Sequence, residues 1–350
     1  MLLHILTFAV AIFAAFLAYL NSSRGEVELF PFTIAKLTLG VLPTTFPAND
    51  STSTALFRNL IGIGSFSFNT LPKIRAVNVY IDEVVPNDFR QIRIFNSNTT
   101  VNENPRDVLV FLYAGAWMLG SVDENERVCR NFALHTNFVV ACVEYSLAPE
   151  HPFPRAFYDV LAAIKWINKN AISYGGKSNR IFLAGESAGG NLAAAVTSWN
   201  YDIDHTNETE KLNIAGLILV YPPLATNFNT ESYNKYESYN GMLTKKEMEY
   251  AWNIYTGGID INTTDYRYQP LYTPGHILQL YPPTYMIIAE YDVLRDDSIV
   301  FAEYLKKRNV SIDMHIYPTI HGFFGREVSV YGYSAVKEAS TKLLECAAYE

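Results

Sequence analysis

Short apolar runs alternate along the chain with longer segments of helical periodicity. Runs rich in Val, Ile and Leu are typical of the central strands of parallel sheets, and they cover residues 108–113, 138–144, 180–184, 214–221, 283–289 and 311–317. Residues 76–85 and 89–95 predict two further strands, and the second of these alternates polar and apolar positions.

The segments between these runs are helix-like, and in one of them Phe157, Leu161, Ile164 and Ile167 show the three-to-four spacing of a half-buried helix. These segments cover residues 124–136, 157–170, 191–199, 245–255, 298–307 and 335–348. Strands that alternate with helices in this way indicate an α/β fold, in which helices cover both faces of a mostly parallel sheet.

Residues 225–279 interrupt the alternation. This segment is rich in Tyr, Asn and Thr and contains one clear helical pattern. Long connections in compact domains are uncommon, and many of them are lids or binding loops. We therefore expect residues 225–279 to be a cap or lid inserted into a catalytic domain that spans residues 76–350.

The start of the chain differs in kind, because residues 2–20 contain no charged side chain. As a helix this segment would be about 28 Å long, close to the ~30 Å hydrocarbon core of a bilayer. It is longer than the apolar part of a signal peptide and lacks a basic start and a small-residue cleavage site. We expect residues 1–20 to be an uncleaved signal-anchor helix, with a cleaved leader as the alternative. Residues 21–75 are expected to form an irregular segment that contributes to the cap.

Several Asn-x-Ser/Thr triplets favour a lumenal or extracellular body. The candidates for N-glycosylation are Asn49, Asn98, Asn207, Asn262 and Asn309. A further triplet at Asn21 lies too close to the expected membrane segment to be used.

The three cysteines say little about whether the protein resides in an oxidising or a reducing compartment. Cys142 lies in a strand-like run and is expected to be a buried thiol. Cys129 and Cys346 fall on helix-like segments, and sequence alone leaves their pairing open.

Composition narrows the possible functions. The chain has 350 residues and a formal net charge of −8, and this charge, without any basic run, argues against nucleic-acid binding. The 24 tyrosines and 21 phenylalanines are enough to build a large core and to line an apolar pocket.

Ser187 lies at the centre of the sequence Gly-Glu-Ser-Ala-Gly, between a predicted strand and a predicted helix. A serine on such a tight turn presents its hydroxyl clear of the sheet. The small residues two positions to either side allow the strand and the helix to approach closely. The pattern alone arises often by chance, but its position between strand and helix favours a nucleophilic serine and acyl transfer.

A serine hydroxyl needs a histidine to accept its proton and a carboxylate to orient that histidine. Asp292 follows the predicted strand at 283–289, and His321 follows the one at 311–317. Active residues of parallel sheets gather beyond the carboxyl ends of the strands, and the order Ser, Asp, His is that of the α/β-hydrolases. Asp296 is a rival carboxylate, although its position suits the cap of the next helix better.

Four blocks of sequence carry a resemblance to a known family. They read Tyr-Ser-Leu-Ala-Pro-Glu-His-Pro-Phe-Pro at 145–154, Glu-Ser-Ala-Gly-Gly-Asn at 186–191, Asp-Val-Leu-Arg-Asp at 292–296 and His-Gly-Phe at 321–323. Over roughly residues 108–323 the chain resembles the hormone-sensitive-lipase group of α/β-hydrolases, and within it the arylacetamide deacetylase-like proteins.

The resemblance implies an α/β-hydrolase fold with Ser187 as nucleophile, Asp292 as orienting acid and His321 as general base. It implies no metal or organic cofactor. The apolar start is similar to that of the deacetylases, whose catalytic domain faces the lumen of the endoplasmic reticulum. We therefore expect a single-pass protein of that membrane with a lumenal catalytic domain, or a secreted protein if the leader is cleaved.

One block departs from the family pattern of His-Gly-Gly-Gly-Trp, because this chain has Tyr-Ala-Gly-Ala-Trp from Tyr113 onward. Backbone amides at this loop stabilise the negative oxygen of the transition state, and the resemblance assigns that oxyanion hole to Gly115, Ala116 and Ala188. Ala116 keeps its N–H, whereas Ala114 costs about 1 kcal/mol if its φ is positive. Reduced activity, a repositioned loop, and packing of Tyr113 in place of the histidine stay open.

We expect a serine carboxylesterase or deacetylase that hydrolyses esters or amides of apolar acyl or aryl substrates. The expected partners are such a small substrate and, through the N-terminal helix, a membrane. Two alternatives remain: a non-catalytic ligand-binding protein with an altered oxyanion loop, and a lipase that acts on lipid esters. The sequence decides neither the acyl chain length nor the oligomeric state.

Overall fold

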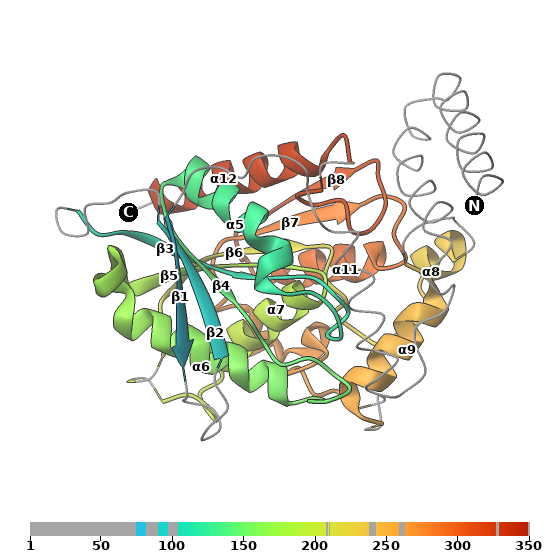
Figure 1. Cartoon of the computed structure of the whole chain (residues 1–350). Coiled ribbons are helices and arrows are strands. Elements are labelled where there is room, and N and C mark those ends of the chain that lie inside the picture. Colours follow the sequence, from blue (N-terminus) through green and yellow to red (C-terminus); the bar gives the residue numbers. More distant parts are fainter. Residues whose placement is uncertain are drawn as a thin grey trace.

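A computed structural model of the chain describes residues 75–81, 90–96, 104–207, 209, 211–237, 243–258, 263–326 and 329–348. Within these ranges strands and helices alternate as the apolar pattern predicts (Figure 1). The strands are β1 (Arg75–Ile81), β2 (Arg90–Asn96), β3 (Arg106–Leu112), β4 (Val139–Val143), β5 (Gly176–Glu186), β6 (Ile214–Val220), β7 (Thr284–Ala289) and β8 (Ile312–Tyr317).

The described strands form one sheet in the order β1-β2-β4-β3-β5-β6-β7-β8. β2 pairs antiparallel with both β1 and β4. All other neighbours are parallel, from β4 through to β8. The central strands β3 and β5 are buried on both faces, which explains their continuous apolar sequence. The mostly parallel α/β sheet predicted from the sequence is confirmed.

Two layers of helices cover the sheet (Figure 1). α5 (Val122–Thr136) and α12 (Gly332–Ala348) pack against each other on one face. α6 (Arg155–Asn170) and α7 (Ala188–Tyr201) pack together on the other face, and α11 (Arg295–Lys306) covers β7 and β8. The short 3₁₀ helix η1 (Ala171–Tyr174) connects α6 to β5.

Residues 225–279 contain more helix than the pattern predicts. α8 (Glu231–Tyr236) and α9 (Lys245–Thr256) lie together at one end of the molecule (Figure 1), and η2 (Pro270–Tyr272) and α10 (Gly275–Leu278) follow them. α9 shows the expected periodicity and begins with a capping box between Thr244 and Glu247. The other three helices are too short for a periodic pattern to reveal them.

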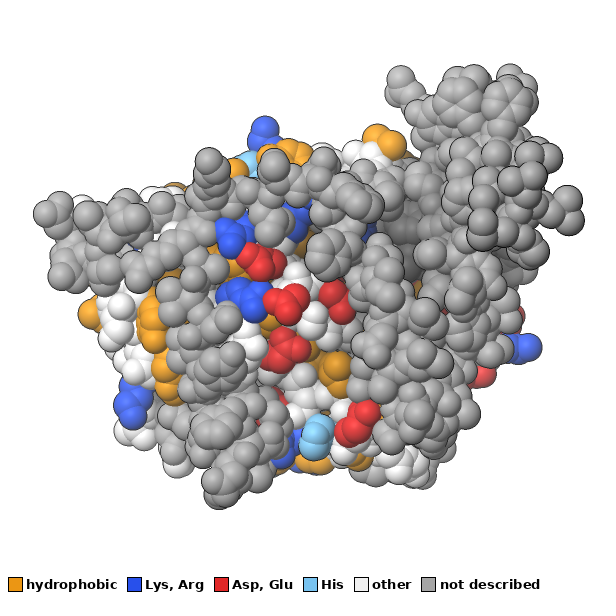
Figure 2. Space-filling view, in the orientation of Figure 1, with side chains coloured by type: hydrophobic (Ala, Val, Ile, Leu, Met, Phe, Trp, Pro, Cys, Tyr) orange, Lys and Arg blue, Asp and Glu red, His pale blue; other side chains and the backbone are white. Residues whose placement is uncertain are grey.

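On the face shown in Figure 2, acidic and basic side chains lie next to one another rather than in areas of one sign. Mixed charge of this kind is typical of an ordinary solvated protein surface.

The expected signal-anchor at residues 1–20 lies outside the described residues, as do Asn49, Asn98, Asn262 and all of the expected irregular segment 21–75 except Arg75, which begins β1. Asn207 and Asn309 are both exposed. In the part of the chain that the structure describes, no helix is both long enough and apolar enough to cross a membrane.

Candidate active site

Ser187 lies on a strained turn between β5 and α7. Its backbone has φ 51° and ψ −117°, a conformation that non-glycine residues rarely adopt. The flanking glycines permit the turn, because a Cβ on Gly185 would lie 2.2 Å from the carbonyl oxygen of Gly189. A Cβ on Gly189 would in turn lie 2.1 Å from the carbonyl oxygen of Leu112 on β3. The close approach expected from the Gly-x-Ser-x-Gly pattern is therefore present.

Parallel pairing of β7 with β8 brings Asp292 and His321 to the same edge of the sheet. The pairing continues beyond both strands, since the amide of Glu290 donates to the carbonyl of Tyr317 over 2.9 Å. The amide of Tyr291 likewise donates to the carbonyl of Thr319 over 2.9 Å. The two loops that carry Asp292 and His321 thus leave the sheet side by side.

A continuous chain of hydrogen bonds joins the three residues. Ser187 Oγ lies 2.9 Å from His321 Nε2, and His321 Nδ1 lies 2.7 Å from Asp292 Oδ2. The other carboxylate oxygen of Asp292 accepts the amide of Leu294 over 2.9 Å. Asp292 is buried, and the His321 side chain is 12% exposed. With its proton on Nδ1, the imidazole leaves Nε2 free to accept the hydroxyl proton of Ser187.

The expected oxyanion loop connects β3 to α5. Gly115 has φ 138°, and its carbonyl accepts the amides of Met118 and Leu119. Among the described residues, the amides of Gly115 and Ala116 donate to no protein acceptor, which leaves them available to a ligand. The same holds for Ala188, the first residue of α7.

The conformational cost that a positive φ would give Ala114 does not arise. Ala114 is not among the residues with positive φ, so its side chain carries no left-handed penalty. Ala116 and Trp117 do have positive φ, at 52° and 58°. The departure of this loop from the glycine-rich pattern therefore concentrates its strain at and after Ala116.

Tyr113 packs in the core at the base of this loop. Its ring stacks on that of Tyr145, with the centroids 4.4 Å apart. The Tyr145 hydroxyl donates to the carbonyl of Tyr113 over 2.8 Å, and the Tyr113 hydroxyl lies 3.4 Å from Glu144 Oε1. The Tyr113 ring is therefore buried, which agrees with the alternative in which Tyr113 packs in place of the histidine.

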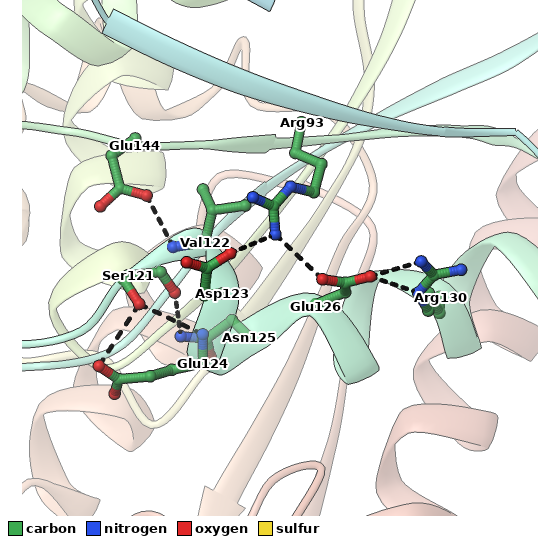
Figure 3. A network of polar contacts seen from close by, with 9 residues as sticks. All are labelled: Arg93, Ser121, Val122, Asp123, Glu124, Asn125, Glu126, Arg130 and Glu144. Atoms are coloured by element: carbon green, nitrogen blue, oxygen red, sulfur yellow. Dashed lines mark hydrogen bonds and ion pairs between the residues drawn. The ribbon is translucent and has the colours of Figure 1, made fainter. Parts of the chain in front are cut away.

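The far end of the loop is fixed where α5 begins (Figure 3). Ser121 caps the helix, and Glu144 Oε2 accepts the amide of Val122 over 2.7 Å. On the outside, Arg93 of β2 pairs with Asp123 and with another carboxylate one turn later. The expected oxyanion loop is therefore held at its two ends by buried packing and by a capped, ion-paired helix.

Sequence reasoning missed the polar groups that tie the loop of Asp292 to residues 225–279. The Asp297 carboxylate accepts the amides of Leu224 and Ala225 over 2.8 and 3.2 Å. Asp296 does not cap α11 as expected, because the helix begins at Arg295 with Leu294 as its cap. Asp296 instead accepts the amide of Ser232 at the start of α8. In the sequence, the adjacent acidic residues 296 and 297 are the feature that could have pointed to these contacts.

The three cysteines are free. Cys129 and Cys142 are buried near each other between α5 and β4, and burial raises the pKa of the Cys142 thiol. Cys346, on α12, packs near Gly216 of β6 instead. The structure therefore contains no Cys129–Cys346 disulfide. Within the described ranges, no group of three or more His, Cys, Asp or Glu side chains is placed to hold a metal ion.

A family model described as the alpha/beta hydrolase fold matches residues 109–325. The chain belongs to this family. The resemblance to the hormone-sensitive-lipase type of these hydrolases is confirmed, whereas closeness to the arylacetamide deacetylases stays a prediction.

The proteins most informative for comparison are esterases. The chain is 30% identical over 296 residues to the carboxylesterase NlhH of Mycobacterium tuberculosis, which covers 83% of this chain and 88% of that protein. It is 26% identical over 326 residues to neutral cholesterol ester hydrolase 1 of Rattus norvegicus, covering 75% and 77%. The ester hydrolase EH1AB1 from the Lake Arreo metagenome superposes with a TM-score of 0.78 at 26% identity, over 92% and 98% of the two chains. The protein is a carboxylic ester hydrolase.

The same comparisons correct the expected localisation. The sequence predicted a single-pass protein of the endoplasmic reticulum membrane, and this prediction is wrong on two findings. No described helix has the length and apolarity to cross a bilayer, and the first curated relatives are mycobacterial esterases. An apolar run at the start of a sequence fits a membrane segment by composition alone, and neither the described structure nor these relatives add support.

Proposed function

We propose that this hydrolase is a serine carboxylesterase or deacetylase that cleaves esters or amides of apolar acyl or aryl substrates. One observation carries the proposal. Ser187 Oγ, the His321 imidazole and the Asp292 carboxylate form a hydrogen-bonded chain with contacts of 2.9 and 2.7 Å. These are the distances that a general base needs to receive a proton from a serine nucleophile.

Acylation follows from this arrangement. His321 Nε2 takes the hydroxyl proton as Ser187 Oγ attacks the substrate carbonyl carbon, and the carbonyl oxygen becomes an oxyanion. The Asp292 carboxylate accepts a hydrogen bond from Nδ1–H throughout, and its negative charge stabilises the imidazolium. The oxyanion reforms its double bond, the alcohol or amine departs with the proton from Nε2, and an acyl-enzyme remains on Ser187.

Deacylation repeats the same steps with water. His321 removes a proton from the water that attacks the acyl-enzyme, and returns it to Ser187 Oγ as the acid leaves. In both halves the oxyanion is bound by the amides of Gly115, Ala116 and Ala188. These amides have no protein acceptor among the described residues, which supports their assignment. Preorganised donors of this kind lower the barrier by about 3 kcal/mol each.

The preference for an apolar substrate is supported by the aromatic surroundings of the oxyanion loop. Trp117, which follows Ala116, is fully buried and packs against Trp252 and Tyr255 of α9. Residues 225–279, which contain α9, are proposed as the cap that encloses the acyl group. The name of the rat relative, a cholesterol ester hydrolase, agrees with an apolar ester.

The test uses the full chain and a fluorophosphonate probe that labels activated serines. Wild type should become labelled and should hydrolyse p-nitrophenyl butyrate. Ser187→Ala should lose label and turnover together, and His321→Ala and Asp292→Asn should reduce turnover by about 10⁴-fold. Ser340→Ala is the matched control, because its buried hydroxyl bonds only within α12, to the carbonyl of Val336. Label that persists in Ser187→Ala would contradict the assignment of the nucleophile.

The substrate class is tested separately. A panel of p-nitrophenyl esters of increasing acyl length, with an aryl acetamide beside them, compares kcat/KM across the candidates. A preference for medium apolar acyl chains or for the acetamide supports the proposal. A maximum at long-chain esters would favour the lipase alternative, and equal values for all esters would contradict an acyl pocket enclosed by the cap.

A further inference from the structure

Tyr221 forms a buried bridge between the nucleophile and the loop of the histidine. It is the first residue after β6, is fully buried, and has φ 34°. Its hydroxyl donates to Glu186 Oε1 over 2.7 Å and accepts the amide of Phe324 over 2.9 Å. Glu186 directly precedes Ser187, and Phe324 lies three residues after His321. One side chain therefore joins the two segments that carry the reacting groups.

The tyrosine ring also contacts the imidazole itself. The centroids of Tyr221 and His321 lie 4.6 Å apart, and the rings are inclined by 55°. Hydrogen bonds at Nδ1 and Nε2 hold the imidazole at two points but leave it able to turn about the line between them. A fixed ring against one side of the imidazole restricts that turn.

Glu186 holds the tyrosine hydroxyl in place. Because that hydroxyl accepts the amide of Phe324, its own proton points to Glu186 Oε1. Glu186 Oε2 has no hydrogen-bond partner among the described residues, and burial raises the pKa of this carboxyl. Three groups oppose this rise in pKa: Arg326, the Tyr221 hydroxyl and His321. A carboxylate that is costly to bury and lies beside a nucleophile requires an explanation beyond packing.

We propose that Tyr221 is a positioning residue for the catalytic base and that Glu186 fixes its hydroxyl. The inference rests on the proposed triad of Ser187, Asp292 and His321. Tyr221 acts through the imidazole and its loop and touches no substrate. Its contribution should therefore lie in kcat, where the alignment of base and nucleophile matters, and not in KM.

The test compares four variants of the full chain with wild type. Tyr221→Phe removes the bridging hydroxyl and keeps the ring. Glu186→Leu removes the acceptor at similar volume, whereas Glu186→Gln keeps an oxygen that can still accept the tyrosine proton. Tyr281→Phe is the control, because it also deletes a buried tyrosine hydroxyl. That hydroxyl is hydrogen-bonded to Ser198 and not to the loop of His321. Each kcat is expressed per active site, with sites counted by phosphonate titration, so that partial unfolding does not count as lost catalysis.

We expect Tyr221→Phe and Glu186→Leu each to lower kcat for p-nitrophenyl butyrate about tenfold, with KM within about twofold of wild type. The double variant Tyr221→Phe/Glu186→Leu should be no slower than either single variant, because both remove one bridge. Glu186→Gln should recover most of kcat, and Tyr281→Phe should leave it unchanged.

Two results would overturn the inference: a kcat for both Tyr221→Phe and Glu186→Leu within twofold of wild type, or losses that multiply in the double variant. If Tyr221→Phe does not fold, the comparison of Glu186→Leu with Glu186→Gln decides the question. Equal losses of kcat in these two variants would overturn the inference. Failure of the proposed triad is recognised separately, because Ser187→Ala would then keep its activity.

Discussion

Trp117 stacks on Tyr255, with ring centroids 4.4 Å apart and ring planes 5° from parallel. Trp117 belongs to the proposed oxyanion loop, whereas Tyr255 belongs to α9, the long helix of residues 225–279. The carbonyl of Trp117 also accepts the amide of Ala148 over 2.9 Å. Trp117 has positive φ, so its backbone depends on these surroundings to hold a conformation it would not adopt alone. The helix α9 therefore helps to hold the proposed oxyanion loop in place.

Replacing Tyr255 by alanine should reduce activity as well as stability. The change removes the ring beneath Trp117, which costs about 3–5 kcal/mol of folding free energy and frees the loop that presents the amides of Gly115 and Ala116. Tyr255→Phe should stay near wild type, because the Tyr255 hydroxyl has no hydrogen-bond partner among the described residues. Thermal melts and kcat per titrated site are the measurements. An alanine variant with unchanged kcat would show that α9 does not support the loop.

Gly115→Ala should abolish activity. A Cβ at Gly115 would lie 2.0 Å from the carbonyl oxygen of Leu119, and the φ of 138° is unfavourable for any side chain. The loop has to shift to accept the alanine, and the loss of even one oxyanion donor lowers the rate by about 10²–10³-fold. Ala114→Gly is the control, because Ala114 lies in the same loop without positive φ. Steady-state hydrolysis of p-nitrophenyl butyrate measures both, and a Gly115→Ala enzyme within tenfold of wild type would refute the expected geometry.

The strands and the three residues of the proposed triad were predictable because their signals are local. Most of the parallel strands are short apolar runs, and Ser187, Asp292 and His321 each lie within four residues of the end of a strand. Parallel pairing then brings the ends of these strands together whatever the rest of the chain does. The sequence positions of the three residues were therefore enough to expect them at one edge of the sheet.

The contacts that support the site were not predictable, because they join segments far apart in the chain. Tyr221 meets Phe324, and Trp117 meets Tyr255, across more than a hundred residues. No local period encodes which tyrosine of an aromatic-rich chain will stack on which partner. The sign of φ at Ala114 was not predictable for a similar reason, since φ values in a loop depend on what the loop packs against.

The cysteines should react with thiol reagents in a fixed order. Cys346 is half-buried, whereas Cys129 and Cys142 are fully buried, and burial raises the pKa of the Cys142 thiol. The thiolate is the reactive form, so native protein should be alkylated by a maleimide at Cys346 first, and at the other two only after denaturation. Mass spectrometry before and after denaturation measures this. A protein that yields fewer than three reactive thiols when denatured without reductant would contain a disulfide and contradict the structure.

Removal of the Asp297 charge should make the protein more stable at neutral and alkaline pH. Burial raises the pKa of Asp297 to about 7, with Asp292 and Asp296 adding to the rise and the amides of Leu224 and Ala225 opposing it. Between its ordinary pKa of 3.8 and about 7, the folded protein keeps a proton that the unfolded chain has lost. The unfolded state thus binds fewer protons, and the contribution of this group to stability falls as the pH rises through that window.

Asp297→Asn does not titrate, and its amide oxygen still accepts both backbone amides. Its melting temperature should therefore match wild type near pH 4 and exceed it increasingly up to about pH 8, whereas an equal difference at every pH would contradict a protonated Asp297.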